Sequence, residues 1–223
     1  MATFNVRHCR GWSGRVDPRR TAAALRDLGA DAVALQELDS GMERSGRVHQ
    51  PDILGRLTGM GVRFMPTLSR PPGKFGIGVL SSAPPEAERA WVLAGGAPEH
   101  PRARRHAAFS LRLRGLWFVS THLSTVAAVR RREMVALAEA VGSLEGPVVV
   151  AGDLNASSKE AFPLTEAGLY CATGDIRTFP SYAPLRAVDH VFVSRDIHVK
   201  GVLRGRTLAS DHLPVAVDIV LSR

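Results

Sequence analysis

Polar side chains recur in this sequence where apolar segments begin or end. The set comprises Asn5 after "ATF", Glu37 after "DAVALQ", His122 after "WFVST", Asp153 and Asn155 after "VVVAG", Asp189 and His190 before "VFVS", and Asp211 and His212 before "LPVAVDIVL". Taken singly, an Asp or Asn at a strand end commonly caps a turn by bonding nearby backbone. Together they bring carboxylates, amides and imidazoles to strand ends, which is the inventory of a catalytic site.

This inventory favours hydrolysis of phosphate esters. Oxygen ligands without cysteine favour a hard cation such as Mg²⁺ over zinc. A hard cation beside Asp, Asn and His suits attack by water on phosphorus, because the metal neutralises charge and fixed donors stabilise the developing oxyanions. The rival nucleophile chemistries lack their motifs. There is no G-x-S-x-G elbow and no G-x-x-x-x-G-K-[ST] loop, and neither Cys9 nor Cys171 has a sequence neighbourhood suited to catalysis.

The composition indicates one globular domain over residues 1–223 with an anionic partner. With 45% hydrophobic residues the chain can bury a sizeable core. The net charge of +8 is carried almost entirely by arginine, because only Lys74, Lys159 and Lys200 are lysines. Arginine enrichment by a GC-rich genome explains part of this excess; nucleic acid, a phosphorylated metabolite or a membrane headgroup explains the rest.

Targeting signals and membrane spans are absent from the sequence pattern. No stretch approaches ~18 apolar residues. If Met1 is the true start, "ATFNV" offers no signal peptide, and we expect a cytoplasmic protein with two free thiols. The working expectation for the oligomeric state is a monomer.

The polar residues at the strand ends must be positioned by helices and strands, and the chain begins with the order strand, helix, strand. The pattern predicts a strand over 2–6, a helix over 17–30 that starts at Asp17 and Pro18, and a strand over 31–36. Further helices are expected over 50–58, 125–144 and 159–167, and strands over 61–68, 75–81, 88–93, 106–113, 116–121, 147–151, 187–194, 197–204 and 213–221. In helix 125–144 an apolar stripe including Val126, Met134, Leu137 and Val141 should face the core, with 130–133 outward. Two packed sheets covered by helices follow from this order.

The ordered motifs resemble a known family. The segments "FNV", "LQELD", "GIGVLSS", "STHLS", "GDLN", "AVDHVFVS" and "SDHLPV" are similar to those of the endonuclease/exonuclease/phosphatase superfamily, the group related to DNase I. The likeness runs from Asn5 to Pro214. It implies an α/β fold, a four-layer α-β-β-α sandwich of two mixed sheets packed face to face, with the site at the edge where strand ends of both sheets meet.

The resemblance also implies roles for individual residues. Glu37 should be the main Mg²⁺ ligand (Mn²⁺ as a substitute), with Asn5 beside it and Asp211 completing the site. Asp153 should orient or deprotonate the attacking water, and Asn155 should hold a phosphate oxygen. Further contacts to the phosphate are implied for His212, held cationic by Asp189, for His122, a candidate leaving-group acid, and for Arg105. Gly152 should let the chain turn so that Asp153 and Asn155 face the phosphate.

The chain departs from the family pattern at three places. Ile77 stands where many members have Asn, and residues 75–81 contain no carboxylate to pair with His122. His190 stands where many members have Tyr, and we interpret it as structural.

The sequence identifies the reaction more closely than the substrate. We expect a phosphodiesterase or nuclease acting on DNA or RNA. The alternatives are a phosphomonoesterase, a lipid or small-molecule phosphodiesterase, and a non-catalytic basic module that binds nucleic acid on the same scaffold.

Overall fold

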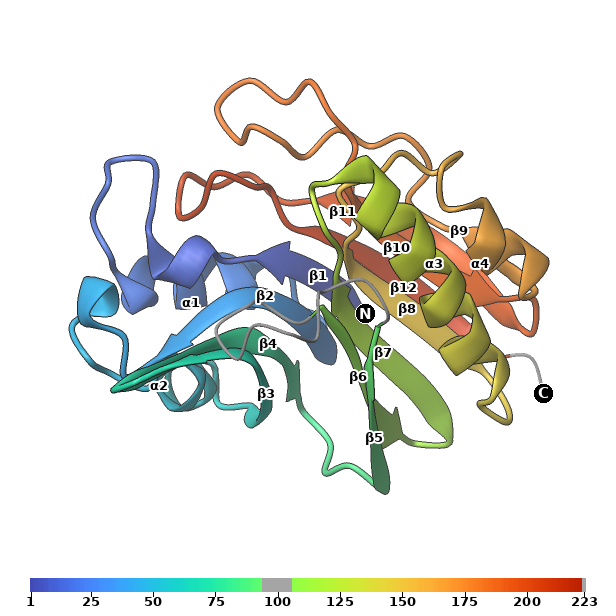
Figure 1. The fold of residues 1–223 in the computed structure, drawn as a ribbon, viewed down its shortest axis with the longest axis horizontal. Coiled ribbons are helices and arrows are strands. Elements are labelled where there is room, and N and C mark those ends of the chain that lie inside the picture. Colours follow the sequence, from blue (N-terminus) through green and yellow to red (C-terminus); the bar gives the residue numbers. More distant parts are fainter. Residues whose placement is uncertain (94–105, 222–223) are drawn as a thin grey trace.

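Two six-stranded sheets form the centre of the computed structural model, which describes residues 1–93 and 106–221 (Figure 1). The first sheet has the order β11 (Ile197–Arg204), β12 (Val215–Leu221), β1 (Ala2–Asn5), β2 (Ala32–Ser40), β4 (Gly73–Ser81) and β3 (Gly61–Arg70). The second has the order β5 (Ala87–Val92), β6 (Ala107–Leu113), β7 (Leu116–His122), β8 (Val148–Asp153), β10 (Asp189–Ser194) and β9 (Leu169–Cys171).

Each sheet contains one parallel strand pair joined by a helix. β1 and β2 are parallel with α1 (Pro18–Asp27) between them, and β7 and β8 are parallel with α3 (Ala127–Gly142) between them. The predicted start of α1 is confirmed, because the Asp17 side chain accepts a hydrogen bond from the Arg19 backbone N–H at 2.9 Å. All other strand pairings are antiparallel, so both sheets are mixed.

Three apolar clusters separate four layers. The central cluster, which includes Ile77, Phe118 and Val191, lies between the sheets. A second cluster packs α3 and α4 (Phe162–Glu166) against β7 and β8, and a third packs α1 and α2 (Gln50–Thr58) against β1 and β2. Figure 1 shows the two helix pairs on opposite outer faces. The predicted four-layer sandwich is confirmed.

The valine strand β8 is buried on both faces. Val149 and Ala151 point into the cluster between the sheets, whereas Val148 and Val150 point into the cluster beneath α3. Because side chains alternate along a strand, burial on both sides requires an uninterrupted apolar run. The strand that ends at Asp153 is therefore held firmly by its neighbours on both faces.

Helix α3 differs from the prediction at its N-terminal end. Met134, Leu137 and Val141 are buried as expected, but Val126 precedes the helix and is 57% exposed. Glu133, expected to face outward, is buried and accepts a hydrogen bond from the Ser124 backbone N–H at 2.8 Å. Burial of this carboxylate ties the start of the helix to the loop that follows His122.

Three other elements differ from the prediction. β2 does not end at residue 36 but continues to Ser40 through a register shift between Leu35 and Leu38. The last short helix spans only Phe162–Glu166 instead of 159–167. The edge strand β9 was not predicted, because three residues paired only with β10 carry too little pattern to recognise.

The prediction that Gly152 turns the chain is wrong. β8 runs straight through this residue, and Gly152 pairs with Thr121 of β7. A Cβ added at Gly152 would lie 2.2 Å from the Thr121 carbonyl oxygen. The glycine is needed because the backbones of β7 and β8 approach closely just before His122 and Asp153.

We expect Gly152→Ala to lower the free energy of unfolding by about 1–3 kcal/mol, because the added methyl group forces two buried strands apart. Gly142→Ala, at the exposed end of α3 with no atom near its added Cβ, should be neutral or stabilising by up to ~1 kcal/mol. Urea unfolding of both variants measures the difference. Equal stabilities would contradict the close approach of the strands.

Candidate active site

Strand ends from both sheets converge on Asp153. β7 and β8 end side by side with His122 opposite Asp153, and antiparallel β10 begins with Asp189 opposite Asp153. From the first sheet, the carboxamide nitrogen of Asn5, the last residue of β1, donates to Asp153 Oδ2 at 3.0 Å. The sandwich therefore brings residues 148 positions apart into contact at one edge.

The Asp153 carboxylate is the most connected group of this edge, and it is almost fully buried. Its Oδ1 accepts the Asn155 backbone N–H at 2.9 Å. Its Oδ2 lies 3.4 Å from His122 Nε2 and 3.8 Å from His212 Nε2, in addition to the bond from Asn5. His122 therefore does face a carboxylate, although none stands in residues 75–81.

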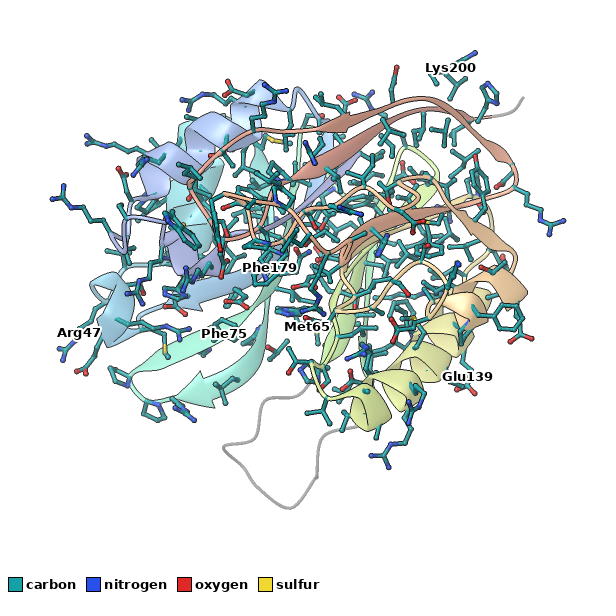
Figure 2. The ribbon with its side chains drawn as sticks, turned by 90° about the horizontal axis from the view of Figure 1, so that it is seen from above. Arg47, Met65, Phe75, Glu139, Phe179 and Lys200 are labelled. Carbon is teal, nitrogen blue, oxygen red and sulfur yellow. The ribbon has the colours of Figure 1, made fainter. Side chains whose placement is uncertain are left out.

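His212 is fixed between two carboxylates. Its Nδ1 lies 2.8 Å from Asp189 Oδ2, which leaves Nε2 directed toward Asp153. The Phe179 ring packs on the imidazole with centroids 4.8 Å apart, and Thr178 Oγ1 donates to the same Asp189 oxygen. In Figure 2, which looks onto this edge, Phe179 lies near the middle of the molecule, whereas Glu139 and Lys200 lie at its periphery.

The electrostatics of this buried cluster raise the pKa of both His212 and Asp153, which favours a protonated histidine beside an aspartate with a raised pKa. Burial by itself lowers the pKa of His212, but the charges of Asp189 and Asp153 outweigh it and raise this pKa to about 10. Burial and the charge of Asp189 raise the pKa of Asp153 to about 6, against the opposing effects of His212 and Asn5. An imidazolium donor and a carboxylate with a near-neutral pKa therefore share this site.

Glu37 reaches the site through a distorted strand. It has a φ of 61°, in the left-handed region that a non-glycine residue rarely adopts, at the register shift in β2. Its carboxylate accepts from the Asn5 carboxamide nitrogen at 3.4 Å, while Asn5 Oδ1 accepts the Arg7 backbone N–H at 3.1 Å. The bulge turns the Glu37 side chain toward Asn5.

Asp211 forms an ion pair with Arg7. Its carboxylate lies 3.3 Å from Arg7 Nε and accepts from Ser210 Oγ at 3.3 Å. Ser210 Oγ also donates to the Asn5 backbone carbonyl at 2.7 Å, which fixes this segment against the end of β1. Asp211 thus lies beside the Asn5 segment, with Arg7 as its partner.

The donor set fits a hard divalent cation better at Glu37 than at His212. Asp153, Asp189 and His212 offer ligand atoms within 4.8 Å of one another. A protonated His212, however, has no lone pair for a metal, so this trio is an ion-pair network. Glu37 supplies carboxylate oxygens close to Asp153, because the Asn5 carboxamide nitrogen donates to both carboxylates. Asn5 Oδ1 accepts the Arg7 backbone N–H and retains a second lone pair. Asp189 Oδ1 is a buried oxygen for which the described residues provide no hydrogen-bond partner.

Asn155 adopts a left-handed conformation immediately after β8, with a φ of 50°. One hydrogen of its carboxamide nitrogen is used by the Leu123 carbonyl at 3.0 Å. That nitrogen carries a second hydrogen, which is the one available to a phosphate oxygen. The bond to Leu123 also links the β8 exit to the loop that follows His122.

Sequence reasoning missed several neighbours of the site and misjudged Cys171. Arg7 and Ser210 lie next to recognised motifs, whereas Thr178 and Phe179 carry no signal that reveals their contact with Asp189 and His212. Cys171 Sγ lies 3.6 Å from His190 Nδ1, so this thiol does have an imidazole neighbour. His190 Nε2 lies 3.0 Å from the Ala156 carbonyl, in line with a structural role. The predicted phosphate contact Arg105 lies outside the described residues.

We expect His212 to remain protonated at pH 8 in the metal-free protein. Since its folded pKa exceeds the unfolded value of about 6.5, its charge stabilises the fold below about pH 6.5, and this contribution is lost as the pH rises toward 10. Asp189→Asn removes the nearest charge and should lower the pKa. Histidine NMR titration measures this shift. Glu160→Gln, at an exposed partner of Arg130, should leave it unchanged; an unshifted His212 in Asp189→Asn would refute the pairing.

The sequence pattern and the fold of this chain are also found in known proteins. The sequence matches the model of the Endonuclease/Exonuclease/phosphatase family over residues 2–212, and no protein of curated function matches it significantly. An endonuclease/exonuclease/phosphatase from Beutenbergia cavernae superposes with a TM-score of 0.79 at 21% identity, over 99% of this chain and 71% of that chain.

Two further solved structures have the same fold. A mannosyl-6-phosphatase from Bacteroides thetaiotaomicron superposes with a TM-score of 0.73 at 17% identity, over 99% of this chain and 98% of that one. A 3'-5' exonuclease from Neisseria meningitidis superposes with a TM-score of 0.72 at 17% identity, over 100% of this chain and 99% of the exonuclease. At these identities the likeness establishes the fold, and the match over residues 2–212 establishes more: the chain belongs to the Endonuclease/Exonuclease/phosphatase family.

Proposed function

We propose that this chain is a Mg²⁺-dependent phosphodiesterase that hydrolyses nucleic acid. The observation that carries the proposal is the buried pair of Asp153 and His212. A carboxylate with a pKa of about 6 faces an imidazolium nitrogen 3.8 Å away, where the strand ends of two sheets meet. A carboxylate base and a cationic donor next to each other suit attack by water on phosphorus.

In this proposal Asp153 accepts a proton from the attacking water while the bond from phosphorus to the leaving oxygen breaks. A general base is most effective when its pKa lies near the working pH, and burial has moved Asp153 in that direction. Asn5 and the Asn155 backbone N–H hold the carboxylate in one orientation. A fixed orientation matters because the reacting atoms must be aligned before the step occurs.

His212 supplies positive charge to the phosphate. Asp189 fixes its Nδ1, so Nε2–H is the donor directed at a phosphate oxygen, and Phe179 limits rotation of the ring. His122 and the free hydrogen of the Asn155 carboxamide complete the donors on the β7 and β8 side. His122 is also the residue that we propose to protonate the leaving oxygen.

Glu37 and Asn5 are the residues proposed to hold the metal, with Asp211 at its edge. A bound Mg²⁺ would neutralise charge on the phosphate oxygens, and Mn²⁺ would serve in its place. The strained backbone of Glu37 supports this assignment, since such conformations cluster at active sites and ligand-binding sites.

The net charge of +8 favours a polyanionic substrate over a single small phosphate ester. No helix in the described residues combines the length and hydropathy needed to cross a membrane. A phosphomonoesterase is the second candidate, favoured by the shared fold with a mannosyl-6-phosphatase. Rates on matched monoesters and diesters separate the two.

We expect Asp153→Asn to lower kcat by at least ~100-fold, because a general base contributes about that much or more. The measurements are nicking of supercoiled plasmid and hydrolysis of bis-nitrophenyl phosphate in Mg²⁺, with EDTA as the metal control. Asp196→Asn is the matched control variant, because Asp196 follows β10 at the end opposite Asp189.

Circular dichroism should show that Asp153→Asn remains folded. Wild-type rates in this variant would refute the assignment of the base. Hydrolysis of the diester without nicking of the plasmid would indicate that the substrate is a small phosphate ester and not DNA. Salt-sensitive DNA binding without hydrolysis of any ester would indicate a non-catalytic module instead.

A further inference from the structure

An exposed pair of aromatic rings lies on two loops that hydrogen-bond to the segment leading to His212. Trp12 and Tyr182 are 48% and 59% exposed, and their ring centroids are 4.3 Å apart with an interplanar angle of 42°. They come from different loops, residues 10–16 after β1 and residues 176–188 before β10. Large aromatic side chains contribute most when buried, so two of them together on the surface leave substantial apolar area open to a ligand.

Both loops are fastened to the segment that carries His212. The Trp12 backbone N–H donates to the Leu208 carbonyl at 2.9 Å, and Ser181, next to Tyr182, donates from its backbone to the Asp211 carbonyl at 2.7 Å. A Cβ at Gly11 would lie 2.9 Å from the Leu208 carbonyl oxygen, so a glycine is needed for this approach. The aromatic pair is thereby fixed relative to the proposed phosphate site.

The surroundings of the pair are cationic. Three segments project from this edge of the sandwich (Figure 1), and each contains two exposed arginines, with aspartates only directly at their ends (Asp17, Asp175, Asp189 and Asp211). The arginines are Arg10 and Arg15 in 10–16, Arg177 and Arg186 in 176–188, and Arg204 and Arg206 in 204–210. Such a surface fits a chain of phosphates.

A hollow between two of these loops offers room for a nucleotide. Its volume is about 480 Å³, and its walls include Tyr182, Leu208, Arg204 and Arg206. Apolar surface and arginines thus line the same space. A nucleotide has an aromatic base that could contact the apolar part of this hollow. A small sugar phosphate has no aromatic ring, and it would need only polar groups.

We propose that Trp12 and Tyr182 stack on an unpaired nucleobase next to the scissile phosphate, so that the preferred substrate is single-stranded nucleic acid. This inference rests on the proposed function and names its substrate class. Only an unpaired strand can present a free base face, because both faces are covered inside a duplex. The arginines bind the flanking phosphates, while the rings recognise that a base is present without selecting which one.

The test compares binding of two labelled single strands of equal length and charge. One carries normal bases, and the other carries abasic sugars throughout. Fluorescence anisotropy is measured in Mg²⁺ in an Asp153→Asn background, so that the strand is not consumed. Stacking is worth ~1–3 kcal/mol per base, so we expect Trp12→Ala with Tyr182→Ala to weaken binding of the normal strand about 5- to 150-fold. Binding of the abasic strand should not change.

Two control variants separate stacking from loop packing. Trp12→Phe with Tyr182→Phe keeps aromatic faces and should retain most of the affinity. Phe162→Ala removes a ring that is 58% exposed on α4, and it should change nothing. An equal loss on both strands, or no loss on either, would overturn the inference.

The hydrolysis assay separates this inference from the function on which it rests. Metal-dependent cleavage by the wild-type protein that is equally fast on normal and abasic strands leaves the phosphodiesterase intact and refutes the stacking. No hydrolysis of any phosphate ester, together with base-dependent binding, refutes the enzyme but keeps the recognition surface.

Discussion

A buried carboxylate between two sheets is the constraint around which this edge of the molecule is organised. Removing Asp153 from water is costly unless hydrogen bonds and an opposite charge compensate. Asn5, the Asn155 backbone N–H and His212 supply this compensation, and they come from both sheets. The packing of the sheets and the state of the carboxylate therefore depend on each other. Burial raises the pKa of Asp153 to about 6, in the direction that its proposed role as a general base needs.

Backbone strain concentrates at the same edge. Of the seven non-glycine residues with positive φ in the described part of the chain, Arg7, His8, Cys9, Glu37 and Asn155 lie where strands β1, β2 and β8 reach the site. These conformations cost free energy and persist only where surrounding contacts enforce them. The contacts here are the register shift in β2 and hydrogen bonds such as those from Asn155 to Asp153 and Leu123. Packing and hydrogen bonds in the rest of the sandwich thus offset the free energy that these strained residues cost.

The sign of the charged side chains changes with distance from Asp153, from mainly acidic at the centre to basic farther out. At the centre, the four carboxylates of Glu37, Asp153, Asp189 and Asp211 outnumber the imidazoles of His122 and His212. Farther out, six exposed arginines lie on the two loops that carry the aromatic pair and on segment 204–210. An acidic centre inside a basic rim agrees with the proposed polyanionic substrate and with the proposed divalent cation.

Most helices and strands, and most of the polar residues that meet at the site, can be identified from the amino-acid sequence. Periodicity, the Asp17 cap and the apolar run of β8 were readable because they depend on neighbours a few residues away. Sequence reasoning misread Glu133, Gly152 and the end of β2, because burial of a carboxylate, close approach of two backbones and a bulge are all set by distant partners. The contacts of Asn5 with Asp153 and of Phe179 with His212 were decided only by the tertiary structure. A strand end can be recognised locally, but which strand ends meet depends on how two sheets pack.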